Sequence, residues 1–212
     1  MASISSLSDA CRELLLDASV VVNLNATGYA DRILSALPID VLVPKPVIKE
    51  LENGAQNGHQ DATDLADLLD RRIVSEAKLV AGAQSEFIAL TAGSAISTLG
   101  DGEAATIACA HATGAWAAID ERKARRICRE RYKPVTVVST VDILAHGHVE
   151  NALSHDEMSK AVLAALEVAN MHVHPHHLNW VINWIDETML HRCKSLPRAV
   201  RDGRARAAKT AS

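Results

Sequence analysis

The sequence predicts an α/β fold in which helices flank a parallel sheet of about five strands. Short aliphatic runs typical of strands alternate with helical patterns as far as residue 147, and this alternation favours a parallel sheet. Hydrophobic residues make up 48% of the chain but aromatic residues only 3%, so aliphatic side chains must build the core. A chain of 212 residues is long enough for one domain with an appendage.

The first strand is predicted over residues 14–24, a nearly continuous aliphatic run typical of a strand buried on both faces. Asp17 interrupts this run, and a carboxylate there requires a reason. The next predicted elements are a helix over 29–37, a strand over 41–43, a helix opened by Pro46, an amphipathic helix over 61–70 and a strand over 73–79. The last are a helix over 86–97, a small-residue helix from Glu103, a strand over 116–119 ending in Asp120, a helix over 122–131, a strand over 135–138 and a helix start over 140–145.

After residue 147 the alternation stops. Helical patterns over residues 155–169 and 177–191 predict a helical hairpin that packs on the same domain. The expected organisation is a main domain over 1–147, a helical extension over 148–195 and a disordered basic tail over 196–212.

The formal net charge of −4 gives no global attraction for nucleic acid, so any such binding must use local patches. Two segments are candidates: residues 122–133, in which seven of twelve residues are basic, and the tail over 192–209. A solvated helix face and a disordered basic end are equally good interpretations of these segments.

The four cysteines are scattered without a C-x-x-C pair, which argues against a disulfide framework and favours a reducing cytoplasm. Neither an export signal pattern nor a run of eighteen apolar residues is present, so we expect a soluble protein that is not exported.

Four motifs occur in order along residues 14–144: LLLDAS, VPKPVIKELE, LGDGEAATIACAHATGA and AIDERKARRICRE. Together they resemble the PIN-domain family, and in particular the VapC-like branch of bacterial and archaeal toxin nucleases, whose fourth acid opens a D-[DE]-R-x-A-R helix. The resemblance implies a PIN-like fold, and the trailing helices also fit that branch.

The resemblance implies that the family's acidic positions fall on Asp17, Glu50, Glu103 and Asp120, with Ser19 supporting the first. Clustered carboxylates repel one another by roughly 4 kcal/mol per pair at 4 Å and an effective dielectric constant of about 20, so they favour a cation. Each of the other three acids also has an interpretation without a metal. Glu50 could be an exposed helix acid, Glu103 an acid favoured by the helix dipole, and Asp120 a helix cap.

Hard oxygen ligands select Mg²⁺ or Mn²⁺. We expect Asp17 and Asp120 to bind the metal directly, Glu103 directly or through water, and Glu50 to orient the attacking water or a second metal. Glu121 is a further candidate ligand, and which of the two adjacent acids is the fourth ligand stays open. The expected nucleic-acid contacts are Arg122, Lys123, Arg125, Arg126 and Thr140. Thr140 also resembles a hydroxyl that family members place near the metal.

By this resemblance, the chain is expected to be a ribonuclease that leaves a 5′-phosphate and a 3′-hydroxyl. We expect it to be the toxin of a toxin–antitoxin pair, held inactive by a small partner protein, and to form a homodimer. A catalytically inactive PIN-like binding module is the main alternative. A phosphatase that uses Asp17 as nucleophile is disfavoured because Ser19 stands where a second acid is usual.

Four histidines at 172, 174, 176 and 177 are dense enough to bind Zn²⁺ or Ni²⁺, but a solvent-exposed loop is the favoured interpretation. Trp180 and Trp184, four residues apart, are expected to anchor the core or an interface rather than to stack on bases.

Overall fold

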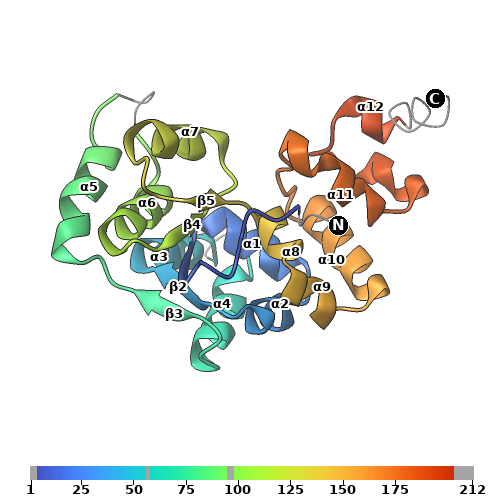
Figure 1. Cartoon of the computed structure of the whole chain (residues 1–212), viewed down its shortest axis with the longest axis horizontal. Coiled ribbons are helices and arrows are strands. Elements are labelled where there is room, and N and C mark those ends of the chain that lie inside the picture. Colours follow the sequence, from blue (N-terminus) through green and yellow to red (C-terminus); the bar gives the residue numbers. More distant parts are fainter. Residues whose placement is uncertain (1–3, 56–57, 95–97, 203–212) are drawn as a thin grey trace.

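The computed structural model describes residues 4–55, 58–94 and 98–202, and its sheet has five strands that pair in parallel throughout (Figure 1). The strand order is β3-β2-β1-β4-β5. The strands are β1 Glu13–Leu16, β2 Asp40–Pro44, β3 Ser75–Ala77, β4 Trp116–Ala118 and β5 Val137–Val138. This confirms the predicted α/β class and the parallel sheet.

Helices connect the strands and continue after the last one. The α-helices are α1 Ala18–Ala26, α2 Ala30–Ala36, α3 Lys45–Ala55, α4 Asp61–Asp70, α5 Ala81–Thr91, α6 Asp101–Thr113, α7 Arg122–Arg131, α8 Thr140–Leu144, α9 Gly147–Ala152, α10 His155–Glu167, α11 Leu178–Asn183 and α12 Arg198–Arg201. Two 3₁₀ helices, η1 Pro175–His177 and η2 Glu187–Arg192, flank α11. Part of the helix predicted over 86–97 falls on residues 95–97, outside the described residues.

Side chains of the central strand β1 alternate between two core layers, as the pleat of a strand requires. Leu14 and Leu16 belong to a cluster formed with α1, α4, α8 and α10, whereas Leu15 belongs to a cluster formed with α5, α6 and α7. Figure 1 shows α5, α6 and α7 grouped on one side, opposite the C-terminal helices. Helices therefore cover both faces of the sheet.

The strand predicted over residues 14–24 is wrong in its second half. β1 ends at Leu16, Asp17 has an extended backbone with φ −79° and ψ 160°, and α1 begins at Ala18. A continuous aliphatic run fits a buried strand and a buried helix equally well. Val20, Val21 and Leu24 are buried on α1, and this packing overrides their preference for strands. Asp17 thus lies at the end of the strand and not inside it.

The C-terminal segment differs from the predicted hairpin in its second arm. The first arm is α10, but residues 177–191 divide into the end of η1, α11 and η2. Asp186 follows the break, and its carboxylate accepts the Thr188 backbone N–H at 2.8 Å and caps η2. Met158 and Val181 lie in the same core cluster as Leu14, so the segment packs on the sheet domain.

Part of the expected disordered tail is folded. Arg198–Arg201 forms α12, and Leu196 and Val200 are 2% and 5% exposed. The rest of that prediction, over 203–212, lies outside the described residues.

All four cysteines are free and buried. In the described ranges, no helix has the length and apolar character needed to cross a membrane.

The strand order reverses direction at one point of the sheet, and this point has a distinct place at the carboxyl ends of the strands. Connections from β1 through β2 to β3 proceed in one direction, and the chain then crosses to β4 on the other side of β1. The strand order therefore reverses between β1 and β4. In open parallel sheets, ligands bind beyond the carboxyl ends of the strands at such a reversal. Asp17 follows β1, and Asp120 comes two residues after β4.

Replacing Leu15 tests the central position of β1. Leu15→Ala should lower the free energy of unfolding by about 2–5 kcal/mol, because its side chain is 1% exposed and leaves a cavity. Ile88→Ala is the control; that side chain is 62% exposed, so its loss should change stability by no more than about 0.5 kcal/mol. Urea denaturation followed by circular dichroism measures both, and equal values would contradict the placement of Leu15.

Candidate active site

The predicted acids come from four different segments around the reversal of strand order. Asp17 and Asp120 follow β1 and β4, Glu50 lies on α3 after β2, and Glu103 lies in the first turn of α6. A cavity of about 680 Å³ opens here, and its lining includes Ser19, Glu50 and Asp120. The structure therefore gathers residues that are far apart in the sequence at one edge of the sheet.

Asp17 is buried, and among the described residues one side chain, that of Ser19, donates a hydrogen bond to it. It is 3% exposed, and its Oδ2 accepts the Ser19 hydroxyl at 2.8 Å. Burial raises the pKa of Asp17 to about 6, and the charge of Glu50 adds to the rise, while hydrogen bonds from Ser19 and the Ala18 backbone oppose it. Ser19 thus supports the first acid.

Glu50 and Asp17 converge on Gly102. A Cβ built on Gly102 would lie 2.4 Å from Glu50 Oε2 and 3.5 Å from Asp17 Oδ1, so the Glu50 carboxylate occupies the space of a side chain. Glu50 as a whole residue is exposed, but its carboxylate end lies against the α6 backbone. Burial raises the pKa of Glu50, and a hydrogen bond from the Gly102 backbone opposes the rise. Glycine at this position allows the two acids to approach.

Glu103 is electrostatically coupled to the other acids. Its Oε2 accepts the Gly100 backbone N–H at 3.1 Å, which completes the start of α6. Burial raises the pKa of Glu103 to about 7, and the negative charges of Asp17, Glu121 and Glu50 contribute to the rise. A favourable interaction with the helix dipole therefore explains the place of Glu103 at the start of α6, but not its electrostatic coupling to the other acids.

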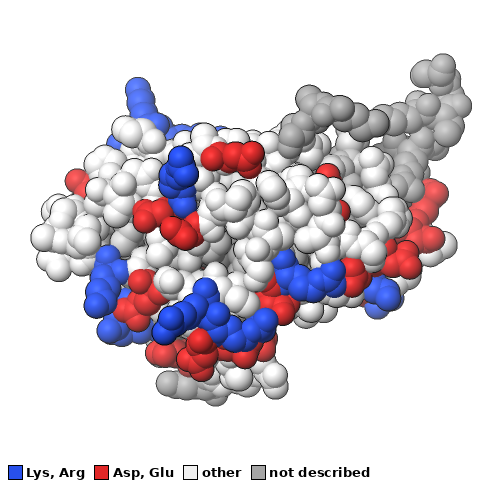
Figure 2. Space-filling model, turned by 60° about the horizontal axis from the view of Figure 1, so that its bottom comes forward, with Lys and Arg blue, Asp and Glu red and all other residues white. Residues whose placement is uncertain are grey.

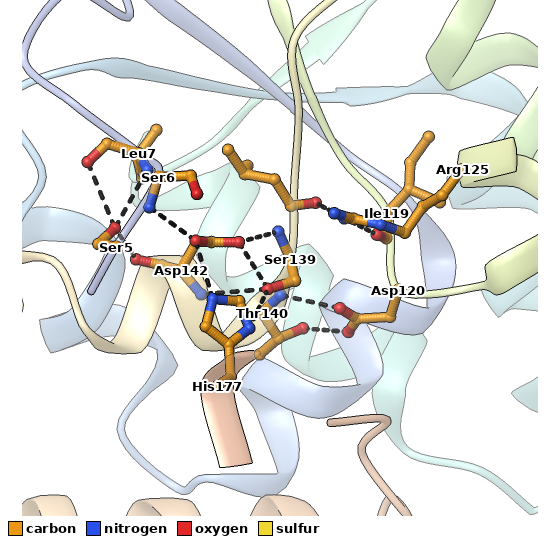
Figure 3. Close-up of polar contacts among 11 residues, drawn as sticks. Ser5, Ser6, Leu7, Ile119, Asp120, Arg125, Ser139, Thr140, Asp142 and His177 are labelled. Atoms are coloured by element: carbon orange, nitrogen blue, oxygen red, sulfur yellow. Dashed lines mark hydrogen bonds and ion pairs between the residues drawn. The ribbon is translucent and has the colours of Figure 1, made fainter. Parts of the chain in front are cut away.

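Asp120 is held by a dense set of donors (Figure 3). Its Oδ1 accepts the Thr140 backbone N–H at 2.9 Å, and its Oδ2 accepts the Thr140 hydroxyl at 2.5 Å and the Asn23 amide at 2.7 Å. Burial nonetheless raises its pKa, because the residue is 2% exposed. Thr140 is 0% exposed, so its side chain orients Asp120 and does not reach a bound nucleic acid.

Asn23 is a site residue that the sequence prediction missed. It is buried on α1 and donates to both Asp120 and Thr140. The signal was present in the sequence: Ser19 and Asn23 are four residues apart and share one face of a helix. The prediction of a strand over residues 14–24 placed them on no common helical face.

The two adjacent acids have different partners. Glu121 is the N-cap of α7, and its carboxylate accepts the Ala124 backbone N–H at 2.7 Å. The capping role considered for Asp120 thus belongs to Glu121. Both residues line the cavity, but only Asp120 is fixed by donors from α1 and α8.

The basic residues of α7 do not act as one group. Arg125 donates from Nη1 to the backbone carbonyls of Ile119 at 2.8 Å and Val138 at 2.7 Å, which ties the ends of β4 and β5 together (Figure 3). Arg125 is half-buried, and these contacts within the protein differ from the nucleic-acid backbone contact that was expected for it. Arg126 forms an ion pair with Glu130 at 3.5 Å.

Arg122 is the α7 cation that lines the cavity, and it donates from Nε to His172 at 3.2 Å. Lys123, also expected to contact nucleic acid, is half-buried and is not among the lining residues. On the face shown in Figure 2, positive and negative side chains are interspersed. That face therefore has no extended patch of a single charge sign.

The donor set suits a hard divalent cation. In the described part of the chain, no three His, Cys, Asp or Glu side chains already form a metal-binding group. Asp17, Glu50 and Glu103 are nevertheless carboxylates with raised pKa values. Burial is the main cause for all three, and the charges of neighbouring cluster acids add to the rise at Asp17 and Glu103. Mg²⁺ in proteins keeps several water ligands and needs only one or two direct carboxylates, so an open arrangement of acids is compatible with it.

His177 is buried, contrary to the favoured interpretation of an exposed histidine loop. It is 0% exposed, with Nε2 3.1 Å from Asp142 Oδ1 and Nδ1 3.5 Å from Ser139 Oγ (Figure 3). Burial acts to raise the pKa of Asp142, but hydrogen bonds from His177, Ser6 and Ser139 hold it well below its usual range.

The residue types resemble a Ser-His-Asp triad, but Ser139 is 0% exposed and its hydroxyl donates to Asp142 itself at 2.7 Å. A substrate cannot reach that oxygen, so the network is structural. It joins the N-terminal segment, α8 and η1.

The remaining histidines and the tryptophans have packing contacts. The ring of His174 lies 4.8 Å from that of His172 and 5.8 Å from that of His176. Trp180 and Trp184 meet edge to face at 5.8 Å and pack against the main core cluster, in agreement with their expected anchoring role.

A comparison with protein-family models identifies the wider group. The model of the family DUF3368, described as a PIN domain, matches residues 13–187, which include most of the C-terminal helices as well as the sheet. Searches of curated proteins and of solved structures gave no significant match. PIN domains are generally nucleases, and the gathered acids suit that class of activity. The match covers well over half of the sequence, and the chain therefore belongs to the PIN-domain family.

Proposed function

We propose that the protein is a metal-dependent endoribonuclease that hydrolyses RNA phosphodiester bonds at the acid cluster. The observation that carries this proposal is the convergence of Asp17 and Glu50 on Gly102, with Glu103 close enough for both charges to raise its pKa. Carboxylates packed in this way at a strand-order reversal are unfavourable without a cation. A catalytic role for the acids would explain why the fold tolerates this unfavourable electrostatic energy.

Asp17, Glu103 and Asp120 would hold Mg²⁺ or Mn²⁺, which lowers the pKa of a bound water and stabilises the charge that develops on the phosphate. The protein's own groups orient these ligands: Ser19 fixes Asp17, while Asn23 and Thr140 fix Asp120. The Gly102 backbone N–H positions Glu50. The raised pKa of Glu50 suits this carboxylate to accept a proton from the attacking water.

We extend the proposal to the VapC-like branch, in which the nuclease is the toxin of a toxin–antitoxin pair. A small antitoxin would hold the acid cavity closed, and the nuclease itself would form a homodimer.

Light scattering during size-exclusion chromatography tests the homodimer. A species of 22.7 kDa, the mass of one chain, at high concentration would exclude it.

Neutralising the acids should abolish cleavage. Asp17→Asn and Asp120→Asn should each lower the rate of cutting a mixed RNA pool with Mn²⁺ by about 100-fold or more, because even partners that only orient a metal ligand contribute roughly 10- to 100-fold. EDTA should stop the wild type. Glu50→Gln should also impair cleavage, whereas Glu52→Gln, on the exposed face of the same helix, should not.

Folded wild type that cuts no RNA with Mg²⁺ or Mn²⁺, and that carries no co-purified partner, would refute the nuclease. The alternative of an inactive PIN-like binding module would then hold.

The metal-free protein should lose stability as pH rises. The folded-state pKa values of Asp17, about 6, and Glu103, about 7, exceed unfolded values near 4. The folded state therefore binds more protons between about pH 4 and 7, and stability falls through that range. Asp17→Asn should stabilise the metal-free protein at pH 8 by roughly 2 kcal/mol, and Mn²⁺ should stabilise only the wild type.

Thermal unfolding at pH 5 and pH 8, with EDTA or Mn²⁺, measures these effects. If Asp17→Asn were less stable than the wild type at pH 8 without metal, the assigned burial cost would be wrong.

Gly102→Ala should impair catalysis more than folding. The new methyl group would displace the flexible end of Glu50, so we expect a stability change within about 1 kcal/mol but a rate lowered by about tenfold or more. Gly82→Ala is the matched control, because its Cβ meets no atom within 4 Å and it also lies in a helix. Equal cleavage rates for the two variants would contradict the placement of Glu50.

A further inference from the structure

A second cavity, of about 780 Å³, opens beside the acid cluster. Its lining includes Lys45, Lys49, Lys78 and Phe87, and it shares Glu50 with the acid cavity. The two cavities are therefore adjacent at one carboxylate. None of the basic patches predicted from the sequence includes these residues.

The sheet order explains why the second cavity lies where it does. Lys45 directly follows β2, and Lys78 directly follows β3, so both mark the carboxyl edge that also carries Asp17. Neighbouring strands lie about 4.8 Å apart, so the end of β3 is roughly 10 Å from the end of β1. A chain lying across this edge would meet the lysines and the acids in succession.

The three lysines are exposed, and among the described residues none of them forms an ion pair, unlike Arg71, Arg126 and other surface cations. They are therefore available to an anionic ligand. Glu76 and Asp101 also line the cavity, so it is not a simple anion pocket. Its lysines suit phosphate groups, and the apolar part of its lining suits an uncharged group.

Phe87 supplies the surface for that uncharged group. It is the only phenylalanine in the chain; it is half-buried on α5 and packs against the second core cluster, with Pro46 and Leu79 also in the lining. An aromatic ring beside lysines is the combination that binds single-stranded nucleic acid, where bases stack and phosphates pair with cations. Bases in a duplex are already stacked on each other.

We propose that this second cavity binds an unpaired nucleotide of the RNA next to the scissile phosphate. The base stacks on Phe87, and Lys45, Lys49 and Lys78 hold the flanking phosphates. The inference rests on the proposed function and makes the enzyme selective for single-stranded RNA.

Binding of the full chain to a labelled single-stranded RNA pool in EDTA, over a series of salt concentrations, tests the lysines without cleavage. Lys45→Ala/Lys49→Ala/Lys78→Ala should weaken binding and flatten the slope of log affinity against log salt by about 2, since each contact to a single strand contributes about 0.7. The control Lys160→Ala/Lys194→Ala removes exposed charges from the C-terminal helices and a following loop, and should leave the slope unchanged.

Phe87→Leu tests stacking and keeps an apolar side chain for the core. It should lower affinity for the single-stranded pool by roughly 5- to 100-fold, with no change in salt slope. A blunt duplex should bind more weakly than the single strands and should not respond to Phe87→Leu. Equal losses for both RNA forms would overturn the stacking assignment.

Cleavage in Mn²⁺ separates this inference from the proposed function. If the wild type cuts RNA and the lysine variant binds and cuts it equally well, the cavity assignment is overturned and the nuclease stands. If the wild type cuts nothing while the lysine variant has lost binding, the nuclease is overturned and the nucleotide site stands.

Discussion

The gathering of carboxylates in a partly buried place, where desolvation and mutual repulsion both act against their charges, is the constraint around which the rest of the site is organised. Two such charges 4 Å apart cost roughly 4 kcal/mol at an effective dielectric constant of about 20. The fold offsets part of this cost with donors, namely the Ser19 hydroxyl at Asp17, the Gly102 N–H at Glu50 and the Gly100 N–H at Glu103. The pKa values of all three acids stay raised, so the donors do not remove the cost and a cation can.

Small residues on α6 bring the acids together. Gly102, Ala104, Ala105 and Ala108 are buried, so the helix backbone can pack closely against the sheet and α3. Close packing gives Glu103 its position near Asp17, and the missing side chain at Gly102 gives room to the Glu50 carboxylate. Larger side chains at these positions of α6 would separate the acids.

Much of the fold could be predicted because hydrophobic periodicity is a local property. α4 and α7 have the bounds expected from their patterns, and Asp120 lies just after the strand predicted before it, whereas Asp17 lies at the end of β1 and not inside a longer strand. The missed features depend on distant partners. Asn23 bonds to Asp120, 97 positions away, and His177 to Asp142, 35 positions away. The roles of Arg125 and Glu121 were missed since a charged side chain does not reveal whether it meets solvent or a backbone group.

An acidic chain can bind a polyanion only if its charges are separated in space. Ionised Asp17, Glu50 and Glu103 repel phosphate, whereas the lysines after β2 and β3 attract it a few strand spacings away. A bound divalent cation would offset most of the negative charge of these acids and leave the lysines unchanged. In the proposed nuclease, RNA would be held first at the lysine side and would reach the acids once the cation has weakened their repulsion of phosphate. Affinity and catalysis then depend on different parts of the same edge, and the net charge of −4 predicts neither.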